Sequence, residues 1–261
     1  MIPIIVIIVG VVMIAVELAR PARKWPKVAG WWGRAILFNG LQVGAVYFAG
    51  VAWDGWLLEH RLWSLESLGP TAGGFIGYFV LTFVYYWWHR ARHSSQLLWN
   101  VFHQFHHSPR RIEIVTTFYK HPVEILANAG ISSVAMYILV GLGPEAAAYA
   151  TLLSGLAELF YHWNVHTPHW VGYIMQRPES HCVHHQYGLH RYNYGDLPLW
   201  DMLFGTFHNP KKWEASCGFD EDEELRIGDM LLARDVQSDK PMPPPGVDLS
   251  HGTDGQPGAA E

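Results

Sequence analysis

The sequence predicts an all-α integral membrane protein. We expect a helical bundle of four or five membrane helices, with a histidine-lined site for two metal ions at its cytoplasmic end. Apolar runs of near-spanning length, basic residues gathered on one side of those runs, and clustered histidines predict this fold class. The chain has 261 residues, of which 50% are hydrophobic and 16% charged, whereas a typical soluble domain carries about 25% charged residues.

Five apolar runs predict the helices, at residues 2–19, 35–58, 71–88, 123–140 and 146–163. The first run has neither the basic start nor the small-residue cleavage site of a signal peptide, so we expect it to be retained. The third ends in four aromatic residues, which is typical of the belt at a membrane interface. Only five residues separate the fourth run from the fifth, which predicts a helical hairpin that either spans the bilayer or re-enters it.

The basic residues predict the orientation of these helices. With five spans, all 18 Lys and Arg residues except Arg61 fall on one side. The positive-inside rule makes that side cytoplasmic, and we expect the inner (plasma) membrane of a bacterium. A net charge of −5 and the lack of a basic stripe argue against a nucleic-acid partner.

The composition changes along the chain and predicts three parts. Residues 1–70 hold the N-terminal membrane helices, and residues 71–215 hold the clustered histidines and form the catalytic domain. Residues 216–261 turn acidic and then rich in Pro and Gly, which predicts a disordered cytoplasmic tail.

Ten of the 16 histidines occur in four tight groups: His89 and His93; His103, His106 and His107; His162 and His166; His181, His184 and His185. Residues three or four apart share a helix face, so each group presents its imidazoles in one direction. Ten imidazoles exceed the ligand set of a zinc site and fit two metal ions with about five nitrogens each. Imidazole suits Zn, Cu, Fe and Ni, and two adjacent redox metals favour oxygen chemistry over hydrolysis.

Side chains next to the ligands should orient the rings. Five residues are candidates for this role: Glu158, Asn164, Asn193, Asp196 and Asp201. Glu158 stands out because a carboxylate within an apolar run is costly unless it is paired or functional.

The spacing H-x3-H, H-x2-HH and H-x2-HH resembles that of the fatty acid hydroxylase/sterol desaturase superfamily of membrane di-iron enzymes. YYWWHR at 85–90, HP at 121–122, NYG at 193–195 and WDMLFGT at 200–206 support the resemblance, which covers residues 71–208. It implies two Fe ions, O₂, and a lipid substrate, such as a sterol, a fatty acyl chain or an alkyl lipid, that reacts at an unactivated C–H bond. The protein as purified could also carry zinc.

The resemblance also implies which metal each ligand binds. One metal would take His89, His93, His103, His106 and His181, and the other would take His107, His162, His166, His184 and His185. No catalytic residue is implied beyond these ligands. The short chain leaves little room for a redox domain, so electrons would come from a separate ferredoxin, cytochrome or reductase.

Hydroxylation is our first hypothesis, and desaturation differs only in the fate of the substrate radical. A zinc-dependent membrane lipid hydrolase is an alternative, but the sequence contains no H-E-x-x-H motif. A non-enzymatic metal-binding or transport protein is another, but it would place ligands along the spans rather than at one end.

Overall fold

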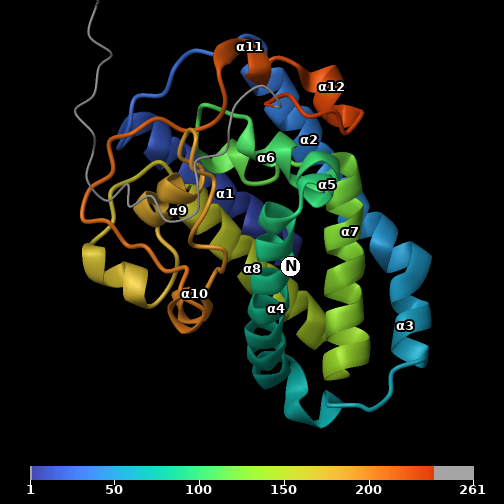
Figure 1. Ribbon diagram of the computed structural model, residues 1–261. Coiled ribbons are helices and arrows are strands. Elements are labelled where there is room, and N and C mark those ends of the chain that lie inside the picture. Colours follow the sequence, from blue (N-terminus) through green and yellow to red (C-terminus); the bar gives the residue numbers. More distant parts are fainter. Residues whose placement is uncertain (1, 238–261) are drawn as a thin grey trace, which may run out of the picture.

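The computed structural model describes residues 2–237, and the regular secondary structure in that range is helical, apart from an isolated bridge between Gln186 and Cys217. The long helices are α1 (Ile2–Ala19), α2 (Trp31–Ala49), α4 (Gly69–Ser94), α7 (Pro122–Ser133) and α8 (Pro144–His162). The short helices are α3 (Gly55–Glu59), α5 (Gln96–Leu98), α6 (Gln104–His107), α9 (Pro178–His184), α10 (Pro198–Leu203), α11 (Glu221–Glu224) and α12 (Ile227–Leu231). In Figure 1 the segments α5, α6, α11 and α12 gather at one end of the long helices.

The five apolar runs are confirmed as helices, and irregular turns extend several of them. Three π-helical segments are η1 (Gly50–Asp54), η3 (Trp99–His103) and η5 (Val134–Val140), and three 3₁₀ turns are η2 (Glu66–Leu68), η4 (Ile114–Thr116) and η6 (His169–Tyr173). Segment η1 joins α2 to α3, and η5 lengthens α7. Helix α7 begins where the Nδ1 atom of His121 accepts a hydrogen bond from the backbone N–H of Val123, and Pro122 occupies its first turn.

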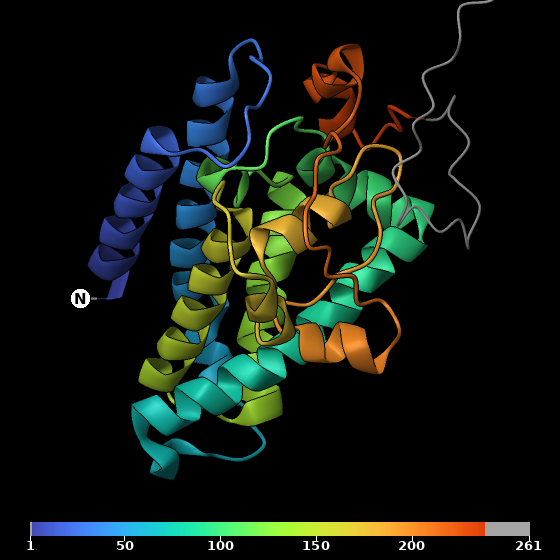
Figure 2. The same ribbon diagram turned by 90° about the vertical axis from the view of Figure 1, so that its left-hand side faces the viewer.

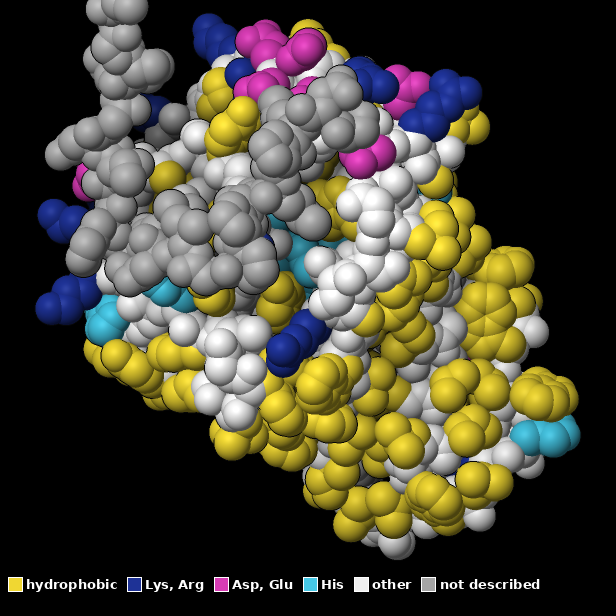
Figure 3. Space-filling model, in the orientation of Figure 1, with side chains coloured by type: hydrophobic (Ala, Val, Ile, Leu, Met, Phe, Trp, Pro, Cys, Tyr) yellow, Lys and Arg dark blue, Asp and Glu magenta, His cyan; other side chains and the backbone are white. Residues whose placement is uncertain are grey.

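Within residues 2–237, three helical segments are long and apolar enough to cross a membrane: Trp31–Glu59, Glu66–Ser94 and Pro122–Val140. Many of their apolar side chains face outward, and Val43, Tyr47 and Val51 are more than 70% exposed. Figure 3 shows hydrophobic side chains over the lower part of the molecule and charged side chains around α11 and α12 at the top. A continuous apolar surface of this kind fits contact with lipid.

Helices α4 and α8 pack closely against each other, and Figure 2 shows α4 crossing α8 at a tilt. Small residues on α4 permit the close approach. A Cβ atom added at Gly74 would lie 2.5 Å from the Cβ of Tyr149, and one added at Gly77 would lie 3.0 Å from the Cβ of Ala150. Such small-residue contacts are common between membrane helices. This packing fixes the end of α4, with His89 and His93, relative to His162 at the end of α8.

The acidic segment that was expected to begin a disordered tail is folded up to residue 237. Phe219 and Met230 are buried in a cluster that includes Phe38, Phe105 and Tyr119. In α11, Glu224 accepts a hydrogen bond from Arg110 at 3.1 Å. The remaining part of the expected tail, 238–261, lies outside the described residues.

Candidate metal centre

Nine of the ten clustered histidines come together in two adjoining groups. The first group, of five residues, contains His89, His93, His103, His107 and His184, and the second, of four, contains His106, His162, His181 and His185. Within each group, one ring nitrogen from every residue lies within 4.8 Å of the others. The rings of His107 and His185 stack with centroids 4.1 Å apart, so the two groups touch.

This grouping differs from the one that the family resemblance implies. His106 and His181 lie with the second group, and His107 and His184 lie with the first. A helix turns about 100° per residue, so residues four apart differ in direction by about 40° and residues three apart by about 60°. His103 and His107 are four residues apart and lie in one group, and His181 and His185, also four apart, lie in the other. His106 and His184 each stand next to one of these residues in the sequence and point to the other group.

His166 lies outside both groups. Its side chain is 77% exposed, and its Nδ1 atom is 3.6 Å from Oε1 of Glu179. Helix α8 ends at His162, and the next residue, Trp163, is extended. The two residues of this H-x3-H pair consequently do not share a helix face, and only His162 points toward the other imidazoles.

Backbone carbonyls orient several of the rings. The Nδ1 atoms of His89, His162 and His184 donate to the carbonyl oxygens of Tyr194, Glu158 and Tyr192, at 2.8, 2.8 and 2.7 Å. A neutral imidazole that donates through Nδ1 keeps a lone pair on Nε2, the form that binds metal. The carbonyl of Tyr192 belongs to a loop, residues 190–193, with an unusual backbone conformation. Three of its non-glycine residues have positive φ angles.

Several ring nitrogens are buried in the interior without hydrogen-bond partners, and this observation tests whether the groups fit a metal. Those of His89, His93 and His184 are buried and make no hydrogen bond, and neither ring nitrogen of His185 makes one. Burial also lowers the pKa of His185 well below its usual value, as do the neighbouring imidazoles. A buried, neutral ring nitrogen without a hydrogen-bond partner costs free energy. Such nitrogens suit coordination to metal ions such as iron.

A buried charged cluster borders the histidines. Oε1 of Glu124 lies 3.0 Å from Nδ1 of His103, which can donate to it, and the same carboxylate pairs with Arg92. Nζ of Lys120 lies 2.6 Å from Oε2 of Glu158. Glu124 is not among the five side chains predicted to orient the ligands, although the sequence carries a signal for it, an acidic residue at the start of an otherwise apolar run.

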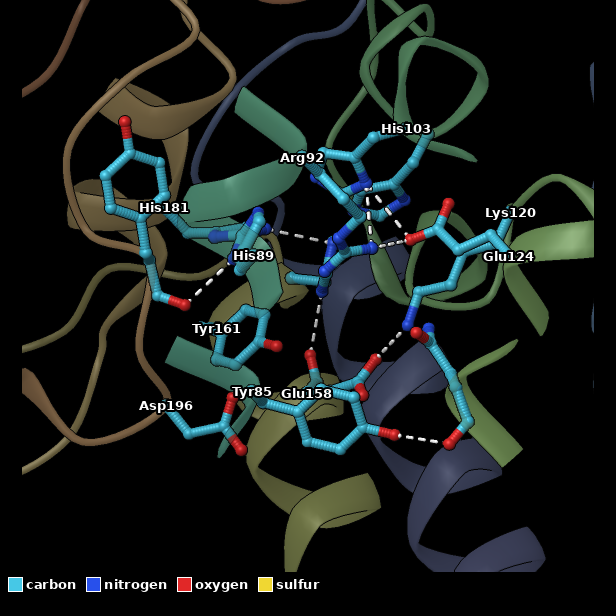
Figure 4. Close-up of a pocket in the computed structure, with 14 residues that line it drawn as sticks. Tyr85, His89, Arg92, His103, Lys120, Glu124, Glu158, Tyr161, His181 and Asp196 are labelled. Carbon is cyan, nitrogen blue, oxygen red and sulfur yellow. Dashed lines mark hydrogen bonds and ion pairs between the residues drawn. The ribbon is translucent and has the colours of Figure 1, made fainter. Parts of the chain in front are cut away.

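A narrow cavity of about 40 Å³ lies between the histidines and this charged cluster (Figure 4). It is lined by His89, His103, His106, His162, His181, Tyr85, Arg92, Lys120, Glu124, Asn128, Glu158, Tyr161, Tyr194 and Asp196. The lining contains no aliphatic residue. Burial, together with the nearby charge of Glu158, raises the pKa of Asp196 to about 7.

The five side chains expected to orient the ligands differ in where they lie. Asp196 lines the cavity, and Glu158 holds His162 through its carbonyl oxygen rather than its carboxylate. Asp201 accepts from the backbone N–H groups of Tyr194 and Gly195, so it holds the loop whose carbonyl orients His89.

The two asparagines act farther from the imidazoles. Asn193 bonds through its amide to the carbonyls of Ser180 and His208, next to His181 on α9. Asn164 instead bonds to the backbone of Arg23 and joins the end of α8 to the linker after α1.

Comparison with known proteins identifies a family that matches the histidine-bearing part of the chain. The family model described as fatty acid hydroxylase matches residues 74–206. The chain is 28% identical to the sphingolipid C4-hydroxylase of Schizosaccharomyces pombe over 54% of its length and 50% of the relative. It is 31% identical to the ornithine lipid hydroxylase of Rhizobium tropici, over 52% of its length and 42% of the relative.

A third relative is the human alkylglycerol monooxygenase, with 31% identity over 66% of the chain and 37% of that protein. The chain thus matches half or less of the length of these curated relatives. No solved structure matches it.

Proposed function

This chain belongs to the fatty acid hydroxylase family, and we propose that it is a membrane di-iron oxygenase that uses O₂ to hydroxylate an unactivated C–H bond of a lipid. The observation that carries the proposal is the meeting of nine imidazoles in two adjoining groups, with buried nitrogens that lack partners. Bound iron would supply the oxygen activation that protein side chains cannot perform.

The protein's own residues would hold and orient the metals. The group of five histidines would bind one iron and the group of four the other, and His166 would bind neither. Glu124 and the carbonyls of Tyr192 and Tyr194 would fix the ring orientations. Burial of the site would keep bulk water away from the reacting carbon.

The polar cavity supports a narrower proposal about the substrate. A bare hydrocarbon chain against this cavity would leave its polar lining, including the Arg92–Glu124 and Lys120–Glu158 ion pairs, next to apolar atoms, which is unfavourable. We therefore propose that the reacting C–H bond lies next to a polar group of the lipid, such as an amide, a hydroxyl or an ether. The relatives include a sphingolipid hydroxylase, an ornithine lipid hydroxylase and an alkylglycerol monooxygenase, and these lipids agree with this class.

A panel of lipids tests the substrate proposal. The purified protein with iron, O₂ and a reduced donor would receive ceramide-like, alkylglycerol and free fatty acid substrates, with products located by tandem mass spectrometry. We expect one added oxygen close to the polar group. Oxidation far along an alkyl chain would refute the substrate class, and loss of two hydrogens without added oxygen would show desaturation instead.

We also propose the topology and the electron source. Helices α1 and α8 would join the three candidate spans as further membrane helices. The histidine end would face the cytoplasm because, of the Lys and Arg residues in 2–237, Arg61 alone lies in a loop at the opposite end. A separate ferredoxin, cytochrome or reductase would deliver electrons there. Residues 71–215 would form the catalytic part, residues 1–70 would hold N-terminal membrane helices, and residues 216–237 would cover the catalytic part.

Metal analysis tests the central proposal. Protein expressed in iron-replete cells and purified in detergent should contain about two irons per chain, with the Mössbauer spectrum of a coupled pair. One zinc and no iron, even after reconstitution with iron, would refute the oxygenase and favour a hydrolase. Weakly held metals of several kinds would favour a binding or transport protein.

A further inference from the structure

A second hollow, separate from the histidine cavity, lies where three chain segments meet. This groove has a volume of about 720 Å³. Residues 22–25 after α1, residues 166–167 after α8 and residues 211–215 form its walls, and Glu179 of α9 also lines it. The proposed oxygenase reaction uses none of these residues.

The groove is rich in unpaired positive charge. Lys24, Lys211 and Lys212 line it, and none of the three forms an ion pair or hydrogen bond within residues 2–237. The carboxylates in its lining are Glu179 and Glu214. Glu179 is already engaged, because it pairs with Arg177 at 3.1 Å and accepts a hydrogen bond from the Thr167 hydroxyl at 2.7 Å.

Buried donors in the groove also lack acceptors. The side chain of Arg23 is 10% exposed, and its three guanidinium nitrogens form no hydrogen bond, although one lies 3.5 Å from Oε1 of Glu179. The indole nitrogen of Trp25 is buried without a partner as well. Trp213 completes this wall, 6.2 Å from Trp25 and 5.7 Å from the Arg23 guanidinium. Because buried donors in native proteins almost always find an acceptor, these groups point to an acceptor-rich anionic ligand.

Under the proposed topology, on which this step rests and in which α1 and α8 cross the membrane, the groove lies at the level of the lipid headgroups. Its first two walls directly follow the ends of α1 and α8, and the backbone N–H of Ala22 donates to the carbonyl of Asn164 at 2.9 Å. Tryptophan and basic residues at the ends of membrane helices are the side chains that meet lipid headgroups. We propose that this groove binds the phosphate group of an anionic membrane lipid, at a site distinct from the substrate cavity.

Native mass spectrometry of the full chain in non-ionic detergent tests this proposal. The probes are phosphatidic acid, phosphatidylglycerol, phosphatidylcholine and inorganic phosphate. We expect retention of the two anionic lipids and an approximately 30-fold loss of phosphatidic acid affinity in the K211Q/K212Q variant, because both cations lie at the groove. The matched control, R226Q/R234Q, removes two cations that pair with Asp229 near α12, and it should bind like the wild type.

Several results would overturn the assignment. Equal phosphatidic acid affinity in K211Q/K212Q and the wild type would refute the site. An equal loss of affinity in R226Q/R234Q would show that the lipid responds to the overall charge of the protein and not to this groove. Phosphatidylcholine held as tightly as phosphatidic acid would refute recognition of an anionic headgroup. Inorganic phosphate bound as tightly as the lipids, and lost in K211Q/K212Q, would refute the lipid source and assign the groove to a soluble phosphate compound. Iron content, measured in each variant, reports separately on the metal centre.

Discussion

Replacement of Glu124 by glutamine tests whether a side chain outside the histidine groups controls metal binding. Glu124 is fully buried, 3.0 Å from Nδ1 of His103, and paired with Arg92. The Glu124→Gln variant keeps the shape and one acceptor oxygen but removes the charge that favours a proton on Nδ1. Loss of a group that orients a metal-binding histidine lowers metal affinity about 10- to 100-fold. We expect iron affinity to fall by that factor while the fold persists.

For the more severe Glu124→Ala variant, metal affinity and folding stability are measured separately. It leaves the Arg92 charge buried without its partner, which costs about 3–5 kcal/mol in comparable buried pairs. Iron affinity is measured by competition with a chelator, and stability by thermal unfolding of the metal-free protein in the same detergent. Glu145→Gln, an exposed carboxylate at the start of α8, is the control for loss of charge. Iron held by Glu124→Gln as tightly as by the wild type would show that this carboxylate does not orient His103.

Three further predictions follow from the packing and the site. His107→Ala should lose metal from the group of five, whereas His166→Ala should retain both metals, as measured by elemental analysis; equal losses would contradict the grouping. Gly74→Ala places a Cβ 2.5 Å from a side-chain carbon of α8 and should destabilise the fold by about 1–3 kcal/mol, whereas Gly130→Ala meets nothing within 4 Å and should not lower the melting temperature. Because the pKa of Asp196 is raised from 3.8 to about 7, the folded state holds a proton that the unfolded state releases, so its contribution to stability falls as pH rises through this window. Thermal unfolding of the metal-free Asp196→Asn variant should lack that decline, and an unchanged pH profile would rule out this assignment.

The helices could be predicted because membrane helices are encoded by local composition. Each of the five apolar runs became a helix within a few residues of its expected ends. The histidine spacing was equally informative, since residues four apart on one helix face the same way regardless of what surrounds them. His89 and His93, His103 and His107, and His181 and His185 accordingly meet as pairs.

The spacing of residues in the sequence did not predict the site where the backbone departs from a regular helix, or where a segment distant in the sequence supplies the contact. His166 is excluded because α8 ends at His162, at the end of the fifth apolar run, so the H-x3-H spacing does not lie on one helix. Glu124 reaches His103 only because α7 packs beside the helical turn that carries that histidine. The carbonyls of Tyr192 and Tyr194 have no side-chain signature, because every residue has a carbonyl and only the loop conformation aims it.

By itself, the sequence determined that the chain makes apolar helices and presents imidazoles at one end of them, because both properties depend on composition and on the period of one helix. The tertiary structure alone decided which histidines share a group, which one is left at the surface, and which charges border the cavity. These outcomes depend on how α4, α7, α8 and α9 pack, and packing brings together residues that are far apart in the sequence.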